Sequence, residues 1–375
     1  MATVQIDRLL DTVIKMGASD LHLAVGKPPT LRLGGRLVAL KTKVLEPEDT
    51  VALMKSISPE RAQTELQEEG GADYGFAYGD RARFRVAIFK QKGYVSVVLR
   101  QIPSKLLTFE DIGLPEVVRE LCRRPRGLFL VTGPTGSGKT TTLYAAINEI
   151  KSDEDKIITI EDPVEYQIRG ITQIPVNEKK GLTFARGLRS ILRHDPDKIL
   201  VGEIRDNETA QIAIQSALTG HLVFTTVHAN NVTDVIGRFI NMGVEPYNFV
   251  SALNCILAQR LVRVICESCK KEVRYPPETL VESGLDPQQW GNAPFYEGPG
   301  CLECAGAGFH GRTAIHELLD LSDRIREMIV DRRPTSEIKR VAHEEGMSFL
   351  RESGVEKVRA GVTTLREINK VTFIE

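Results

Sequence analysis

The segment 133–140 reads GPTGSGKT, and it constrains the fold of this chain more than any other stretch. It matches the pattern G-x-x-x-x-G-K-[ST], with an apolar run at 128–132 before it and a helical pattern at 141–150 after it. Glycines let a loop backbone wrap closely around a phosphate. The N–H groups of such a loop and of the following helix N-terminus then point toward the anion, and the helix dipole favours its negative charge. The segment therefore predicts a phosphate-binding P-loop between a strand and a helix.

The residue types of this loop predict that it binds ATP together with Mg²⁺. The ammonium of Lys139 is expected to neutralise the β- and γ-phosphates, and the hydroxyl of Thr140 to bind Mg²⁺. The predicted nucleotide contacts are Gly133, Pro134, Thr135, Gly136, Ser137, Gly138, Lys139, Thr140 and Thr141. A glycine-rich turn without a ligand is the alternative, but it would leave the agreement between motif and strand–helix context unexplained.

The chain after residue 127 alternates between short apolar runs and amphipathic helical patterns. The apolar runs lie at 128–133, 156–162, 198–204 and 221–228, and the helical patterns at 141–150, 184–193 and 208–219. Such alternation is typical of a parallel sheet covered on both faces. We therefore expect an α/β domain over 127–375. It includes a cysteine-bearing subregion at 262–312 and a helical C-terminal part at 313–375, with helices at 323–331, 335–345 and 347–360.

Residues 1–100 predict a smaller α/β domain. An amphipathic helix fits 4–17, with an apolar stripe formed by Ile6, Leu9, Leu10, Val13 and Ile14. Alternating segments typical of a sheet with one solvated face follow at 20–25, 30–40, 73–78, 82–91 and 94–102. The proline-containing segment 101–126 is predicted to be a linker with a short helix, and we hypothesise that it is a hinge.

Two acidic positions follow predicted strands and are candidates for a hydrolytic site. Glu161 ends one apolar run, with Asp162 directly after it, and Glu203 ends another. Carboxylates at strand tips beside a P-loop can hold the hydration shell of Mg²⁺ or polarise an attacking water. Acidic residues also follow strands simply because loops are solvated, but the nearby P-loop favours the catalytic interpretation.

Two histidines stand at opposite ends of the predicted strand near 222–227. His221 precedes this strand and His228 follows it. A histidine near the γ-phosphate could sense hydrolysis or orient a side chain. A histidine that merely caps a strand is equally compatible with this spacing, so the residues alone leave both interpretations open.

Four of the six cysteines form two C-x-x-C pairs, Cys266/Cys269 and Cys301/Cys304. Four thiolates can complete a tetrahedral Zn²⁺ site, and closed coordination indicates a structural role. We therefore predict a zinc site that fixes the irregular segment around these cysteines. Four reduced thiols without a metal are the alternative, whereas no thioredoxin-like pattern supports a redox role.

Composition and charge limit the partners of the chain. Hydrophobic residues make up 42%, so a core can form, while 49 basic and 50 acidic residues give a net charge of −1. This balance gives no global attraction to nucleic acid, and no nucleic-acid partner is expected. No apolar run approaches the ~20 residues of a membrane span, and residues 1–15 lack the pattern of a signal peptide. We expect a cytoplasmic protein that reaches a membrane only through partners.

Four segments, in this order, resemble one known family. The P-loop, TIEDPVEY, LVGEIRD and TGHLVFTTVHAN are similar to the Walker A, Asp box, Walker B and His box of the secretion ATPases. That family powers type II secretion and type IV pilus assembly or retraction. Segments 17–23 and 82–89 are similar to its N-terminal domain, and 300–319 and 349–368 to the C-terminal part of its assembly and secretion branch.

The resemblance implies an N-terminal PAS-like domain, a hinge and a RecA-like ATPase core, assembled as a homohexamer. It implies that Glu161 and Glu203 are catalytic carboxylates, with Glu203 activating water, and that His221 and His228 lie near the γ-phosphate. Three arginines match arginines that stabilise charge on the transferred phosphoryl group, namely Arg85, Arg100 and Arg312. For each of them, a solvated charge at a strand edge is the alternative.

The predicted function is a hexameric motor that hydrolyses ATP to power pilus assembly or type II secretion through an inner-membrane platform protein. The four cysteines and the segment 323–330 resemble the assembly and secretion branch, and a pilus retraction ATPase is the alternative. The additional N-terminal domain that docks assembly ATPases to the membrane is not expected in this chain. The near-neutral charge disfavours a nucleic-acid translocase, and the intact acids disfavour a non-hydrolysing scaffold.

Overall fold

A computed structural model describes residues 4–79, 81–102 and 106–373 of the protein. The chain divides into two compact units, Met1–Lys105 with Leu302–Ala307, and Leu106–Cys301 with Gly308–Glu375. The segment 101–126 that the sequence predicts as a linker includes residues 103–105, which lie outside the described residues. None of the helices in the described parts of the chain is long and apolar enough to cross a membrane.

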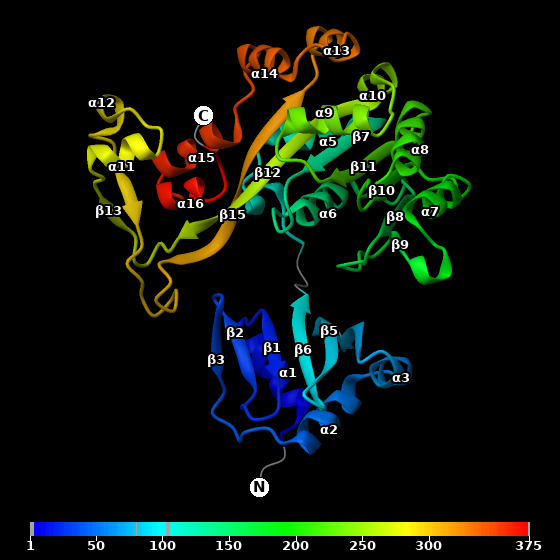
Figure 1. Ribbon diagram of the computed structural model, residues 1–375, viewed down its shortest axis with the longest axis vertical. Coiled ribbons are helices and arrows are strands. Elements are labelled where there is room, and N and C mark those ends of the chain that lie inside the picture. Colours follow the sequence, from blue (N-terminus) through cyan, green and yellow to red (C-terminus); the bar gives the residue numbers. More distant parts are fainter. Residues whose placement is uncertain (1–3, 80, 103–105, 374–375) are drawn as a thin grey trace. The chain divides into compact units, whose positions relative to one another are not determined.

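The first unit contains a six-stranded antiparallel sheet with the strand order β3-β2-β1-β6-β5-β4 (Figure 1). The strands are β1 (Asp20–Leu23), β2 (Thr30–Leu33), β3 (Arg36–Ala39), β4 (Gly71–Tyr78), β5 (Ala82–Gln91) and β6 (Tyr94–Ile102). Gly34 and Gly35 adopt positive φ angles of 52° and 83° at the turn between β2 and β3, as only glycine does readily. This turn divides the segment predicted as one interrupted strand.

Three helices pack with this sheet: α1 (Ile6–Met16), α2 (Pro47–Ile57) and α3 (Glu60–Glu68). Helix α1 buries Leu9, Leu10 and Val13, which confirms the predicted apolar stripe in its central part. Helices α2 and α3 occupy the stretch between the predicted strand segments 30–40 and 73–78, where no element is predicted. Helix α2 begins with Pro47 after a capping box between Glu46 and Asp49, which is a local start signal.

The second unit is built on a seven-stranded sheet with the order β15-β12-β7-β11-β10-β8-β9. The strands are β7 (Gly127–Thr132), β8 (Ile157–Glu161), β9 (Thr172–Pro175), β10 (Lys198–Val201), β11 (Leu222–Val227), β12 (Leu253–Ile265) and β15 (Phe309–Asp320). The strands from β12 to β9 pair in parallel, as predicted, whereas β15 pairs antiparallel with β12 at the edge. The sheet is therefore mixed rather than fully parallel.

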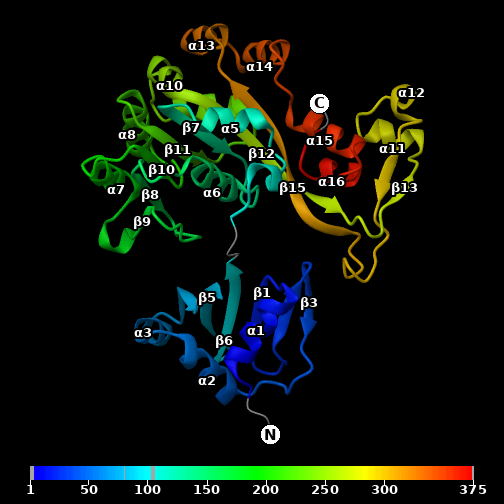
Figure 2. The same ribbon diagram turned by 180° about the vertical axis from the view of Figure 1, so that it is seen from behind.

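Helices cover both faces of this sheet (Figures 1 and 2). One core contains Leu128 and Leu130 of β7 and packs against α7 (Phe184–Ile191), α8 (Asn207–Leu218), α9 (Val232–Asn241) and α10 (Pro246–Ala252). The other contains Phe129 and Val131 and packs against α4 (Phe109–Ile112), α5 (Glu116–Cys122) and α6 (Lys139–Ile150). Alternate residues of one strand thus enter opposite cores, which explains the continuous apolar runs in the sequence.

The remainder of the second unit carries two small strands, β13 (Lys271–Val273) and β14 (Phe295–Glu297), and short helices α11 (Pro277–Glu282) and α12 (Pro287–Trp290). It ends in α13 (Asp323–Val330), α14 (Thr335–Glu344), α15 (Leu350–Arg359) and α16 (Leu365–Asn369). The three helices predicted near the C-terminus are confirmed. The long strands β12 and β15 were not predicted, because polar residues interrupt their apolar pattern at positions that the tertiary structure uses.

Candidate functional site

The predicted P-loop lies between the end of β7 at Thr132 and the start of α6 at Lys139. Gly133, Gly136 and Gly138 adopt positive φ angles of 145°, 81° and 90°. A Cβ atom on Gly133 would lie 2.6 Å from the carbonyl oxygen of Gln259, so a side chain does not fit there. The loop therefore has the tight, glycine-dependent path that a backbone needs to surround a phosphate.

The Lys139 ammonium folds over this loop. Its Nζ donates to the carbonyl oxygens of Gly133 at 2.8 Å and Pro134 at 3.2 Å. Burial lowers the pKa of Lys139, and the nearby carboxylate of Glu203 opposes that shift. Thr140, at the start of α6, is exposed. A cation and an exposed hydroxyl thus stand at the N-terminus of α6, which is suited to a phosphate and its Mg²⁺.

Gln259 on β12 holds the P-loop in place through its side-chain amide. The sequence patterns did not predict this role. The Gln259 side chain is fully buried, its Nε2 donates to the carbonyl oxygen of Ser137 at 2.7 Å, and its Oε1 accepts from Thr142 Oγ1 at 2.9 Å. One amide therefore joins β12 to both the loop and helix α6. The available signal was a polar residue inside an otherwise apolar run, but periodicity alone does not distinguish such a residue from a strand break.

Glu203 and His228 meet at the carboxyl edge of the sheet, where the P-loop also begins. Glu203 follows β10, His228 follows β11, and β11 pairs directly with β7. His228 Nε2 lies 3.4 Å from Glu203 Oε2. Burial and the nearby Lys139 lower the pKa of His228, which favours the neutral form of its ring. The structure thus brings together Lys139, Glu203 and His228 from three separate segments.

Arg205 adds a cation to this group. Its guanidinium contacts Glu203 at 2.5 Å, Asp162 at 3.7 Å and Glu178 at 4.0 Å. The Glu203 side chain is only 17% exposed, whereas that of Arg205 is 51% exposed. Arg205 therefore holds one oxygen of Glu203 while His228 approaches the other.

Glu161 lies in a different environment at the end of β8. It is 3% exposed, and it accepts hydrogen bonds from the hydroxyls of Tyr144 and Thr159 and from Gln173 Nε2, the last at 3.2 Å. Burial raises the pKa of this carboxyl group. The carboxylate therefore faces a buried polar network, and the neighbouring Asp162 is the exposed acid at this strand end.

The structure does not bring His221 to the P-loop. His221 precedes β11, and the six residues of that strand separate it from His228, a span of roughly 20 Å at the rise of a β-strand. Its Nδ1 lies 3.0 Å from the carbonyl oxygen of Ser216. His221 lines a different cavity, of about 680 Å³, at the opposite edge of the sheet.

The three arginines expected to reach the nucleotide lie in different settings. Arg85 on β5 and Arg100 on β6 are opposite each other in the first unit, and Arg100 Nε donates to Asp20 at 2.8 Å. Arg312 is exposed on β15, opposite Arg263 of β12. The roles expected for these three arginines stay predictions.

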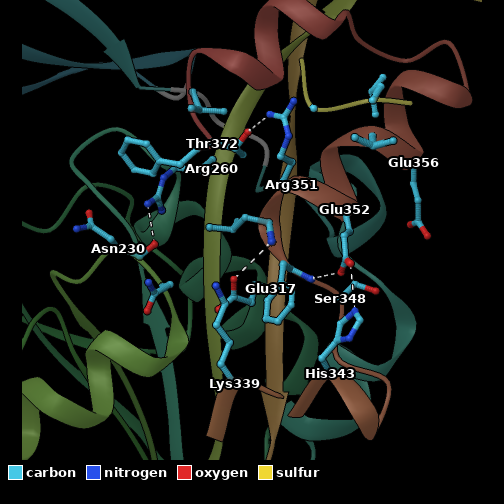
Figure 3. A pocket seen from close by; sticks show the side chains of 18 of the residues that line it. Asn230, Arg260, Glu317, Lys339, His343, Ser348, Arg351, Glu352, Glu356 and Thr372 are labelled. Atoms are coloured by element: carbon cyan, nitrogen blue, oxygen red, sulfur yellow. Dashed lines mark hydrogen bonds and ion pairs between the residues drawn. The ribbon is translucent and has the colours of Figure 1, made fainter. Parts of the chain in front are cut away.

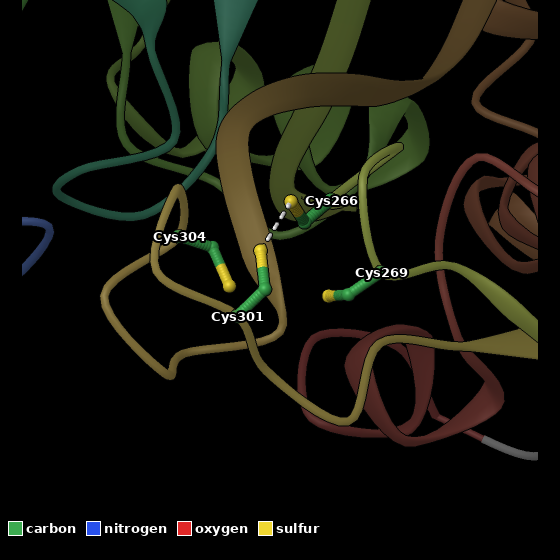
Figure 4. Close-up of side chains that lie close together, drawn as sticks. All are labelled: Cys266, Cys269, Cys301 and Cys304. Carbon is green, nitrogen blue, oxygen red and sulfur yellow. Dashed lines mark hydrogen bonds between the residues drawn. The ribbon is translucent and has the colours of Figure 1, made fainter.

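The four cysteines predicted to bind zinc lie together, and Figure 4 shows their side chains turned toward a common point. The sulfur atoms of Cys266, Cys269, Cys301 and Cys304 all lie within 4.8 Å of one another. The two sulfurs of Cys266 and Cys301 are 3.8 Å apart. A tetrahedron with Zn–S distances of ~2.3 Å has sulfurs about 3.8 Å apart, so the donor set and its spacing fit Zn²⁺.

Comparisons with known proteins agree with this fold. The Type II/IV secretion system protein family matches residues 2–370. The type IV pilus assembly ATPase PilB of Thermus thermophilus is 50% identical over 269 residues, which are 71% of this chain and 30% of that protein. The type II secretion system protein E of Pseudomonas aeruginosa is 40% identical over 380 residues, covering 98% of this chain and 74% of that protein.

A solved structure extends the likeness to three dimensions. The crystal structure of the pilus retraction motor PilT with bound ADP matches with a TM-score of 0.78 at 32% identity, over 98% of this chain and 97% of that one. The predicted α/β architecture and the predicted resemblance are thereby confirmed. The chain belongs to the Type II/IV secretion system protein family.

Proposed function

We propose that this protein is an ATP-hydrolysing motor that powers type IV pilus assembly or type II secretion. The names of the similar proteins, PilB and type II secretion system protein E, support this function. The observation that carries it is the convergence of Glu203, His228 and Lys139 at the P-loop end of the sheet. A phosphate-binding loop alone would indicate nucleotide binding, whereas a carboxylate held next to it supports hydrolysis.

The residues of the site suggest a division of labour. Bound Mg²⁺ would neutralise charge on the phosphates, and Thr140 would hold this ion while Lys139 and the loop amides hold the phosphates. Glu203 is the acid that would accept a proton from the attacking water, because its carboxylate lies beside Lys139 rather than in a closed network. His228 and Arg205 would keep that carboxylate in place through the contacts described above.

Four further residues, outside the group formed by Lys139, Glu203, Arg205 and His228, would contribute to hydrolysis. Arg85, Arg100 and Arg312 would stabilise charge on the phosphoryl group once subunits assemble, and Glu161 would support the site from its buried network. We further propose a homohexamer that acts on an inner-membrane platform protein and associates with the membrane through it. The match to PilT supports pilus retraction as a second candidate, and pilus length in a deletion strain complemented with this gene would separate extension from retraction.

Purified protein tests the central claim. Lys139→Ala is expected to weaken ATP binding by about 100-fold or more, since charged hydrogen bonds contribute ~1.5–3 kcal/mol each and the loop loses its only cation. Binding of a fluorescent ATP analogue in magnesium buffer and phosphate release are the measurements. Lys151→Ala, just beyond the end of α6, is the matched control. Wild-type protein that neither binds nor hydrolyses ATP would refute the proposal.

The proposed structural role of zinc has its own test. Purified protein is expected to contain about one Zn²⁺ per chain, because four thiolates complete one site. Cys301→Ser should lose the metal and lower the unfolding temperature, whereas Cys122→Ala, a buried cysteine of α5 outside the cluster, should retain it. Elemental analysis by mass spectrometry gives the metal content, and metal-free wild-type protein of unchanged stability would contradict the prediction.

A further inference from the structure

A cavity of about 790 Å³ opens within the second unit on the side of the C-terminal helices (Figure 3). Arg260 of β12, Glu317 of β15, His343 of α14 and Glu352 of α15 line it. Several of its charged groups already have protein partners: His343 Nε2, for example, lies 3.1 Å from Glu352 Oε1. Charged residues of this cavity thus connect α14 to α15, and two of the others are deeply buried.

Glu317 connects two helices through one carboxylate. It is 5% exposed, and its two oxygens accept from the backbone N–H groups of Val232 at 3.0 Å and Leu350 at 3.4 Å. These are the first residues of α9 and α15. The first N–H groups of a helix have no partner within the helix, and a negative charge there is favoured by the helix dipole. One buried carboxyl group therefore bonds to the start of both helices; burial raises its pKa, and these two N–H groups oppose that shift.

Arg260 holds the same segment from the neighbouring strand. It is 8% exposed, and its Nη2 donates to the carbonyl oxygen of Asn230 at 2.7 Å. Ala258 pairs with Glu317 in the register of β12 and β15. Arg260, two residues further along, therefore projects from the same face of the sheet as Glu317. Arg260, bonded to Asn230, and Glu317, bonded to Val232, thus hold adjoining parts of one short segment.

This segment follows His228 directly. The hydroxyl of Thr132, the last residue before the P-loop, accepts from the N–H of Ala229 at 3.0 Å and donates to its carbonyl oxygen at 3.1 Å. The chain after His228 is therefore bonded to β7 at Ala229, to β12 at Asn230 and to β15 at Val232. These contacts leave the backbone beside His228 little freedom to shift.

We propose that Arg260 and Glu317 are positioning residues that hold His228 against Glu203, and that Glu317 links this arrangement to helix α15. The inference rests on the proposed function, because it assigns the two buried charges to the same hydrolytic site. It also predicts a physical link between the C-terminal helices and the edge of the sheet that carries the P-loop. A displacement of α15 would break the hydrogen bond from Leu350 to Glu317, whose other oxygen holds the start of α9.

Glu317→Gln tests this link, since an amide offers only one acceptor oxygen for two N–H groups. Hydrogen exchange is expected to accelerate at the start of α9, of α15, or of both. The turnover number should fall by about 10- to 100-fold through misplacement of His228 and Glu203, with unchanged affinity for an ATP analogue. Unchanged exchange at both helix starts, or an unchanged turnover number, would overturn the proposal.

Glu367→Gln is the matched control for a purely structural effect. Glu367 is also a buried carboxylate of the second unit, 6% exposed, and accepts from Arg263 Nε at 3.0 Å and Nη2 at 2.8 Å. This variant is expected to lower the unfolding temperature without changing the turnover number of the folded protein. An equal fall in turnover in Glu367→Gln and Glu317→Gln would indicate general destabilisation and contradict the positioning role.

Arg260 gives a graded second test. Arg260→Lys keeps a cation that can reach one carbonyl oxygen, so its loss of turnover should be smaller than that of Arg260→Leu; equal losses would oppose the role of the charge. Hydrogen exchange measured without nucleotide tests the positioning role independently of ATP hydrolysis. If the wild type does not hydrolyse ATP, the proposed function fails, and exchange at α9 in Glu317→Gln and Arg260→Leu still decides whether the two charges hold the segment.

Discussion

The ends of strands β8 and β10 offer the same kind of residue in two different environments. Glu161 ends β8 and Glu203 follows β10, and these two strands are parallel neighbours in the mixed sheet. Glu161 is 3% exposed within a closed network of hydroxyl and amide donors, whereas Glu203 contacts Arg205 and His228 near Lys139. An acidic residue at a strand tip is therefore not sufficient to define a catalytic carboxylate.

The strand order explains the difference. From β7 to the edge of the sheet the strands lie in the order β7-β11-β10-β8-β9. Strand β10 is therefore nearer to β7, the strand before the P-loop, than β8 is. Gln173 of β9 and Tyr144 of α6 close around Glu161. On its P-loop side Glu203 instead contacts His228, which follows the end of β11. The register separates the two acids as well: Val201 pairs with Ile160, so Glu203 lies one residue beyond the level of Glu161, after its strand has ended.

The largest expected effect belongs to Glu203. In Glu203→Gln the turnover number should fall by about 10²–10⁴-fold, the usual contribution of a general base, while the affinity for ATP stays within about twofold. Phosphate release and analogue binding measure the two quantities. Glu178→Gln, which changes another acidic partner of Arg205, is the matched control and should turn over like the wild type. If Glu203→Gln turned over at the wild-type rate, Glu203 would not be the general base, and the proposed functional difference between Glu203 and Glu161 would be wrong.

Glu161→Gln should have a smaller effect on turnover and a clear effect on stability. The loss of one carboxylate oxygen from a buried network is expected to cost about 1–3 kcal/mol. Burial raises the pKa of Glu161 above its ordinary value of 4.5, so the folded state binds this proton more tightly than the unfolded state. The wild type therefore loses stability as pH rises through the raised pKa, and the neutral variant does not.

Chemical denaturation over a series of pH values from 4 to 8 measures this difference. The stability of the variant relative to the wild type should improve as pH rises, and Gln173→Ala, which keeps the titrating group, serves as a comparison. A difference that is independent of pH would show that Glu161 does not titrate as its burial implies. A fall in turnover as large as that of Glu203→Gln would place both acids in the chemistry.

The smallest effect is expected at the opposite edge of the sheet. His221→Ala removes one hydrogen bond to the carbonyl oxygen of Ser216, so it should cost about 1 kcal/mol of stability and leave turnover nearly unchanged. His228→Ala, at the other end of the same strand, should lower turnover. Parallel steady-state assays make the comparison, and a larger loss of turnover in His221→Ala would contradict the separation of the two edges.

Much of the site could be predicted from sequence because its parts are local. The P-loop depends on glycines at fixed spacing within one segment, and the two C-x-x-C pairs each bring two donors together within one turn. Residues such as Gln259, Arg260 and Glu317 could not be found in this way. They are polar residues in long strands, and their partners lie in segments far away along the chain.

The P-loop, the alternation of buried strands and helices, the family and the two cysteine pairs could all be predicted from the chain alone, because each depends on residues that are close together in it. Which strand ends share an edge with the P-loop became known only from the folded arrangement. The folded arrangement placed Glu203 and Glu161 in different environments, and His228 and His221 at opposite edges of the sheet. It also brought the buried residues Arg260 and Glu317 to their partners. The physical reason is that side-chain environment depends on strand order and on burial, and both arise from contacts between distant segments.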